Sequence, residues 1–168
     1  IPDTASYDIF DAVLNPWSTH VCVDVAGTAH VALWVDHARL RAINRAFGTT
    51  HALRVDGPPM VERPSDILVV PVARSGARGA ARVVGVANVD DEAYGIACGG
   101  ARVAVVGRHR REVGRDNTEL HALLAVLDGA NAEPVVRSFD GDQNAIAQTV
   151  TLDDDGTVWV GGTESWTQ

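Results

Sequence analysis

Apolar residues recur along most of the chain in short runs that either alternate with polar residues or are continuous, as in β-strands. Short stretches rich in Gly, Asp, Asn and Ser separate these runs. Such residues suit tight turns, because glycine accepts positive φ and short polar side chains bond to their own backbone. In residues 20–35, for example, one apolar strand leads to a turn at Gly27 and a second strand follows. The pattern therefore predicts a succession of β-hairpins.

These hairpins recur with a period of about fifty residues, which is the sequence signature of a repeat architecture. One family of similar segments comprises residues 42–57, 93–107 and 145–161. A second family comprises residues 20–35, 67–87 and 122–139, with turn glycines at Gly27, Gly76 and Gly129 that are 49 and 53 positions apart. Each period thus holds four short strands. We expect an all-β chain of about three four-stranded antiparallel sheets, each of which buries its faces by stacking on its neighbours.

Residues 35–47 are an exception, because their apolar positions have helical spacing and Asp36 is a suitable N-cap. Local propensity alone predicts a helix there. The alignment of this segment with DDEAYGIAC, which starts at Asp90, favours a strand instead, since tertiary context often overrides propensity. Both interpretations stay open at this stage, and the strand is preferred.

Length and charge limit the function classes. A chain of 168 residues can form one domain with a sizeable core. It contains no continuous apolar segment of the length that a membrane span requires. The net charge of −8 argues against nucleic acid as a main partner, because phosphate binding needs a basic surface. The only dense basic cluster, residues 108–111, is interpreted as a solvated loop.

The sequence predicts no metal site and no cofactor. Cys22 and Cys98 are 76 positions apart, without CxxC spacing, and the six histidines are dispersed. Two buried free thiols are the preferred interpretation, and a disulfide is the alternative if the protein is exported. The segment LDDDGTVW resembles the start of a calcium loop but lacks a distal glutamate, which favours a solvated hairpin turn.

The order and spacing of these segments, from DDEAYGIA through ARVAVVG and LHALLAVLDGANAEPVVRSF to LDDDGTVWVGG, resemble the β-propeller repeats of bacterial cell-surface proteins, of the SBBP and delta-60 types. The resemblance covers residues 20–168. It implies a partial propeller, with approximate blade material at residues 8–57, 66–107 and 119–162. Propellers close with roughly four to eight blades, so we expect the remaining blades to come from a longer chain or from partner subunits.

The same resemblance implies export to the periplasm or cell surface and a non-enzymatic scaffold or binding role, with a protein or a carbohydrate as ligand. It supplies no catalytic residue. Inserted length in repeat proteins falls on exposed faces, so we expect ligand contacts on the loops at residues 57–66 and 108–118.

An alternative from another class is a nucleotide pyrophosphatase. Five segments follow in the order of the trimeric dUTPase motifs: residues 5–12, 73–76, 89–95, 141–148 and 161–167. This resemblance implies phosphate contacts by Arg74 and Ser75 and a water activated by Asp91 before Tyr94. Gln148 would complete a site for Mg²⁺-bound dUTP, although GDQNAIAQ lacks the arginine of its motif. The fifty-residue repeat has no explanation in this interpretation, which therefore ranks second.

Overall fold

The computed structural model describes residues 19–35, 55–56, 65–86, 89–112, 118–129, 133–139 and 144–165. Within these ranges all regular structure is β-strand, so the all-β prediction is confirmed for them. The strands are β1 (Thr19–Val23), β2 (Ala29–Val35), β3 (Val55–Asp56), β4 (Asp66–Val72), β5 (Ala81–Val84), β6 (Asp90–Gly99), β7 (Arg102–Glu112), β8 (Thr118–Asp128), β9 (Val135–Phe139), β10 (Asn144–Leu152) and β11 (Val158–Ser165). This part of the chain contains no helix long and apolar enough to cross a membrane. Of the segment 35–47, Val35 ends β2 and the rest lies outside the described residues.

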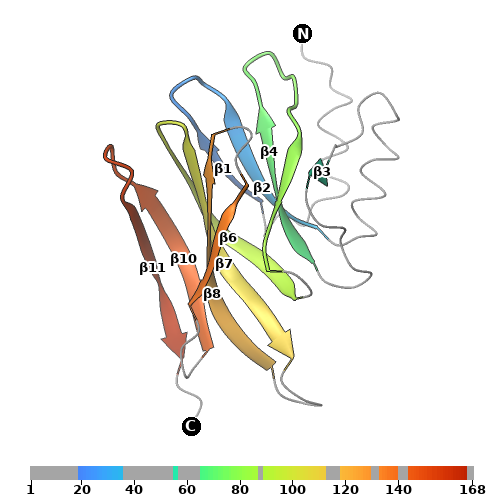
Figure 1. Ribbon diagram of the computed structural model, residues 1–168, viewed down its shortest axis with the longest axis vertical. Helices are drawn as coiled ribbons and strands as arrows, with labels where there is room; N and C mark the ends of the chain where they lie inside the picture. Colours follow the sequence, from blue (N-terminus) through green and yellow to red (C-terminus); the bar gives the residue numbers. More distant parts are fainter. Residues whose placement is uncertain are drawn as a thin grey trace.

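The strands form three antiparallel units (Figure 1). The first sheet has the order β1-β2-β4-β5, and the two residues of β3 pair in parallel with β5 at its edge. The second sheet has the order β6-β7-β8-β9, and β10 and β11 form a separate hairpin that we name the third hairpin. Apart from β3, neighbouring strands within each unit follow chain order, as expected for a meander.

The sheets divide the chain differently from the predicted ranges. The range 66–107 contains β4 and β5 of the first sheet together with β6 and β7 of the second. The physical reason is the long connection between β2 and β4, residues 36–64, which lengthens the first unit. When the sequence is aligned with itself at a shift of about fifty residues, it therefore matches two successive hairpins of one sheet. Gly27 belongs to the first of these hairpins and Gly76 to the second.

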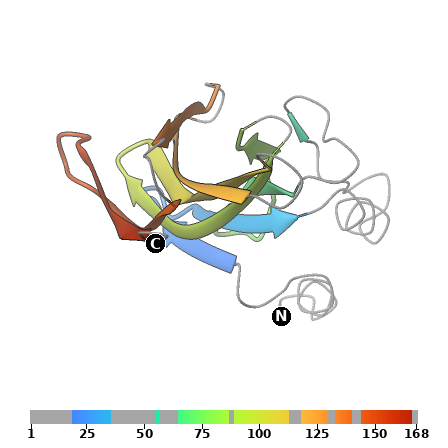
Figure 2. The same ribbon diagram turned by 90° about the horizontal axis from the view of Figure 1, so that it is seen from below.

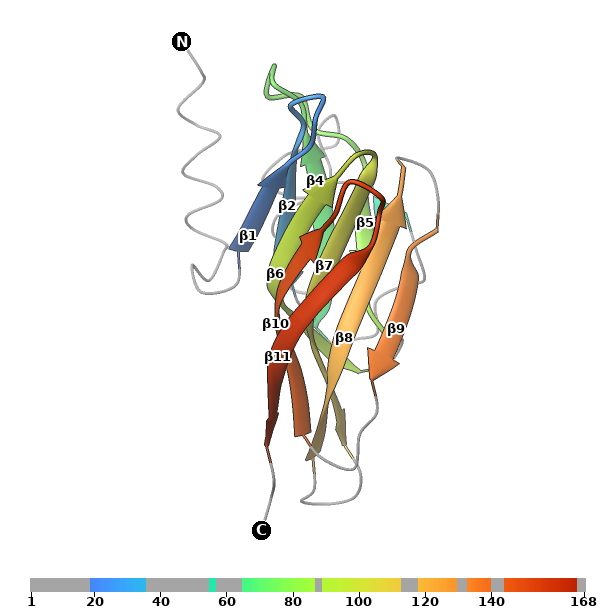
Figure 3. The same ribbon diagram turned by 90° about the vertical axis from the view of Figure 1, so that its left-hand side faces the viewer.

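The second sheet lies between the first sheet and the third hairpin (Figures 2 and 3). Alternate residues of β7 divide between its two faces. Val103 and Val105 pack in the core shared with the first sheet, whereas Ala104 and Val106 pack against the third hairpin. A strand covered on both faces explains why residues 103–106 are continuously apolar.

Among the described residues, five glycines have positive φ, between 57° and 84°, and they stand at the hairpin turns: Gly27, Gly76, Gly100, Gly129 and Gly156. The predicted turn glycines Gly27, Gly76 and Gly129 are therefore confirmed as such. The turns after Asp24 and Asp153 have the same hydrogen bonds. The Asp24 N–H donates to the Thr28 carbonyl at 3.0 Å, and the Asp153 N–H donates to the Thr157 carbonyl at 2.9 Å. The turn after Ala73, in the second hairpin of the first sheet, has the same bonds, with the Ala73 N–H donating to the Ala77 carbonyl at 2.8 Å, so three hairpins share this turn.

Side-chain hydrogen bonds of one kind join each unit to the next. Asp90, the first residue of β6, accepts the Ser65 N–H through Oδ1 at 2.8 Å. Asn144, the first residue of β10, accepts the Leu120 N–H through Oδ1 at 2.8 Å. In both strands the pairing register shifts after the third residue that follows, Ala93 in β6 and Ala147 in β10. The two junctions are therefore equivalent.

We expect Asn144→Ala and Asp90→Ala each to lower the free energy of unfolding by about 1–2 kcal/mol, because they leave the backbone N–H groups of Leu120 and Ser65 without their acceptors. Urea unfolding at pH 5 is the suitable measurement, since Asp66 and Asp91 beside Asp90 have pKa values raised to about 6 and about 8 and are then largely neutral. Exposed Asp128→Ala serves as the control, with a loss of under about 0.5 kcal/mol. A loss confined to one of the two junctions would contradict their equivalence.

Candidate functional site

A cavity of about 330 Å³ lies between the first and second sheets, near their hairpin turns. Its lining consists of Asp24, Thr28, His30, Val69, Pro71, Gly79, Ala80 and Arg82 from the first sheet and its turns, and Val103, Leu127 and Gly129 from the second. Cys22, His30 and Pro71 are cross-strand neighbours on β1, β2 and β4, so they form one row beneath the cavity. The cavity continues the gap between the sheets beyond the core around Val69 and Val103.

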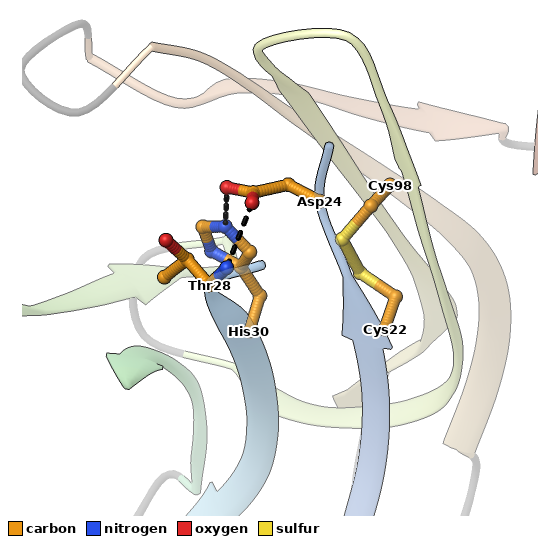
Figure 4. Close-up of a disulfide and its surroundings, with 5 residues drawn as sticks. All are labelled: Cys22, Asp24, Thr28, His30 and Cys98. Carbon is orange, nitrogen blue, oxygen red and sulfur yellow. Dashed lines mark hydrogen bonds and ion pairs between the residues drawn. A yellow bond between two sulfur atoms is a disulfide. The ribbon is translucent and has the colours of Figure 1, made fainter. Parts of the chain in front are cut away.

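Asp24 and His30 line this cavity and lie against each other in the turn of the first hairpin, as Figure 4 shows for their side chains. The His30 Nε2 lies 3.0 Å from the Asp24 Oδ2, and the Thr28 N–H donates to the Asp24 Oδ1 at 2.8 Å. The hydrogen bond from His30 is the main cause that lowers the pKa of Asp24, with the Thr28 N–H second. An ionised carboxylate only accepts hydrogen bonds, so the Nε2 of His30 carries its hydrogen.

The corresponding turn of the third hairpin shows that the fold itself does not require a histidine. There the Trp159 Nε1–H donates to the Asp153 Oδ2 at 2.7 Å, with the same spacing in the sequence as between Asp24 and His30. That pair is on an exposed surface, whereas the side chains of His30 and Asp24 are only 17% and 19% exposed. The ring N–H of either a histidine or a tryptophan can donate to the aspartate that begins this turn. An imidazole adds a second ring nitrogen that can take part in a further hydrogen bond.

Cys22 and Cys98 form a disulfide between β1 and β6, with a Cα–Cα distance of 5.6 Å (Figure 4). The preferred prediction of two free thiols was therefore wrong. A separation of 76 positions does not reveal that the first strands of two successive sheets lie side by side. Both cysteines pack against the core between the sheets. The covalent bond thus holds the two walls of the cavity together at one side.

Arg82 adds a positive charge to the lining of the cavity, from β5 toward the other edge of the first sheet. It lies on β5 opposite Val69 of β4 and lines the same cavity. The walls between Arg82 and the Asp24–His30 pair are mostly apolar, from Val69 and Leu127 among others. The cavity therefore combines a carboxylate at one end, a guanidinium at the other and an apolar middle.

We expect Asp24→Ala to lower the free energy of unfolding by about 2 kcal/mol and Asp153→Ala by under about 1 kcal/mol, because Asp24 accepts both the His30 ring N–H and the Thr28 N–H at a largely buried site, whereas Asp153 accepts the Trp159 N–H on an exposed surface. Chemical denaturation of the two variants measures this. Thr151→Ala, an exposed position on β10, is a control with little expected effect. A cost at Asp153 that equals or exceeds the cost at Asp24 would contradict this difference in burial and hydrogen bonding.

The structure does not bring the five dUTPase-like residues into one site. Asp91 is fully buried, and its Oδ2 accepts the Val86 N–H at 2.8 Å. Desolvation is the main cause that raises its pKa to about 8. Asp91 lies near Asp66 at the start of β4, whereas Arg74 and Ser75 stand in the turn after that strand, roughly 20 Å away.

The remaining candidates have structural partners. The Ser75 Oγ accepts the Ala77 N–H at 3.3 Å within its own turn. The Tyr94 hydroxyl donates to the Glu92 Oε2 at 2.9 Å, and desolvation is the main cause that raises the pKa of Tyr94 to about 12. Gln148 is exposed at the bulge of β10, with its backbone beside Gly95. Only Tyr94 and Gln148 therefore come from neighbouring backbone segments.

The predicted binding loops prove to be partly strand. Residues 108–112 belong to β7 and Thr118 begins β8, while residues 113–117 lie outside the described part of the chain. Asp66 begins β4, and residues 57–64 are likewise outside the description. The basic cluster is not a solvated loop, because His109 is buried and stacks on His121 at a ring-centroid distance of 4.9 Å. In the sequence, the charged residues of this cluster interrupt the apolar pattern by which a strand is recognised.

Within the described ranges, no group of three or more His, Cys, Asp or Glu side chains is arranged to hold a metal ion. No protein-family model matches the chain, and a search of curated proteins finds no match either.

Proposed function

We propose that the chain is a β-propeller-type repeat scaffold with a non-enzymatic binding role toward a protein or carbohydrate ligand. The observation that carries the proposal is the equivalence of the two junctions, at Asp90 and Asn144, on either side of the second sheet. Equivalent junctions repeat one geometrical step from sheet to sheet, and propellers are built by such repetition.

Exposed apolar residues beside the third hairpin, and a strand edge unpaired within the described part of the chain, support the proposal that further strands pair with β11. Val69 and Val84 are almost fully buried between the first two sheets, whereas Val135 and Phe139 on β9 are 56% and 48% exposed. Val160 on β11 is 40% exposed, and β11 pairs with β10 alone among the described strands. Two more strands beside β11 would cover these residues. We propose that they come from the same polypeptide or from a partner subunit.

The disulfide supports a location in the periplasm, at the cell surface or in the extracellular medium. Disulfides persist in oxidising compartments and are rare in reducing ones. The Cys22–Cys98 bond joins two sheets of the scaffold, where it adds stability by restricting the unfolded chain.

The scaffold proposal is tested by the addition of the missing hairpin. A second copy of residues 118–139, fused after the third hairpin, should raise the unfolding temperature and reduce the binding of a hydrophobic dye. In a matched control, the copies of Leu123, Ala125 and Leu127, whose originals face the neighbouring sheet, are replaced by aspartate. An equal effect of both fusions, or none, would contradict the proposal.

We expect no pyrophosphate release from dUTP in the presence of Mg²⁺, because Asp91 is fully buried and accepts the Val86 N–H, so its carboxyl group does not face a bound triphosphate. A coupled assay for pyrophosphate measures this. Pyrophosphate release that is abolished by Asp91→Asn, but not by Asp128→Asn, would instead establish the pyrophosphatase alternative.

A further inference from the structure

The cavity between the first two sheets presents opposite charges at its two ends. Asp24 and His30 belong to the hairpin of β1 and β2, and Arg82 belongs to β5. Two strands, β2 and β4, lie between β1, which leads into Asp24, and β5, so the backbones that carry Asp24 and Arg82 are about 14 Å apart and their side chains narrow this gap. A ligand in the cavity can therefore reach both ends only if it has two polar groups separated by a short body.

The body of such a ligand must be apolar. Val69 and Pro71 of the first sheet lie on one side of the cavity, and Val103 and Leu127 of the second lie on the other. Val103 and Leu127 are cross-strand partners, so they present one continuous apolar surface. A chain of methylene groups between these walls gains from leaving water.

Each end of the cavity can still bind a ligand group. The Asp24 carboxylate accepts hydrogen bonds from His30, Thr28 and Ala26, and an ionised carboxylate has about four acceptor positions, so one position is left for a ligand. A guanidinium has five N–H donors, so Arg82 can hold a ligand carboxylate together with a protein partner. A ligand with a single charge would displace water from both charged ends but compensate only one of them.

We infer that this cavity binds a short ω-amino acid, with its ammonium group at Asp24 and its carboxylate at Arg82. The inference does not depend on the number of sheets in the complete scaffold. It assigns the cavity a ligand class from the charges and walls of its lining alone.

Isothermal titration calorimetry with δ-aminovalerate, valerate and amylamine tests this assignment on the disulfide-bonded protein. We expect δ-aminovalerate to bind at least about tenfold more tightly than either singly charged analogue. Asp24→Asn and Arg82→Gln should each weaken its binding by about 10- to 100-fold. Asp153→Asn is the matched control for the first variant, because Asp153 has the same place in an equivalent turn outside the cavity.

Arg102→Gln is the control for the second variant, since the exposed Arg102–Asp128 pair is not part of the lining. Both controls should leave binding unchanged. If Arg82→Gln does not fold, Ala80→Trp fills the cavity from an exposed position and should abolish binding. The inference is overturned if δ-aminovalerate does not bind, if valerate or amylamine binds equally well, or if the cavity variants bind as the controls do.

Discussion

Replacement of both Cys22 and Cys98 by alanine should lower the free energy of unfolding by about 4 kcal/mol. The disulfide closes a loop of 76 positions, and in the chain-entropy account a loop of this length restricts the unfolded state by roughly that amount. Alanine leaves the other members of the core between the two sheets in place, so we expect the variant to keep the same sheets. Urea unfolding of the variant and the parent protein measures the difference.

A reducing agent provides the control for this experiment. It should destabilise the parent protein by a similar amount and leave the double variant unchanged. Two titratable thiols in the unreduced, denatured parent protein would contradict the Cys22–Cys98 bond. So would a parent protein whose stability does not respond to reduction.

The stability of the protein should fall by several kcal/mol as the pH rises from about 4 to about 8, and Asp91→Asn should remove most of this fall. Burial raises the pKa of Asp91 from 3.8 to about 8. In that interval the folded protein holds a proton on Asp91 that the unfolded chain has lost, so each pH unit costs up to about 1.4 kcal/mol. Above pH 8 the carboxyl is ionised in both states and the slope ends.

Asp66 adds to the same slope over a narrower interval, because burial is the main cause that raises its pKa to about 6. Asparagine at position 91 retains an oxygen for the Val86 N–H and has no charge to bury. The variant should therefore be the more stable protein at pH 8. Denaturant unfolding at several pH values measures both profiles. Exposed Asp128→Asn should keep the parent slope, and a parent protein with constant or rising stability over this interval would contradict the burial of Asp91.

The hairpins were predictable because their signals are local. A run of alternating apolar residues and a glycine at Gly27, Gly76 or Gly129 lie within one short segment, and the structure has a turn at each. The grouping of hairpins into sheets was not predictable in the same way. It depends on pairing between β2 and β4 across residues 36–64, and a long connection displaces the period without altering any local signal.

The candidate site could be predicted only in part. His30 was correctly expected in a strand, but its cavity also needs Arg82 and Leu127 from two other hairpins. One signal was present in the sequence: Asp24 and Asp153 both precede Gly and Thr at the same spacing, followed by His30 in one turn and Trp159 in the other. A comparison of these two turns would have shown that His30 and Trp159 are different residues at the same position, and so would have pointed to His30.

Residue-resolved amide hydrogen exchange is the most direct test of a stack of equivalent sheets. The account predicts the slowest exchange in β7, at Val103 to Val106, because this strand is paired on both edges and covered on both faces. It predicts fast exchange at every second amide of β11, on the edge that β10 does not pair. Exchange in β7 as fast as at the outer strands, or uniform protection along β11, would contradict it.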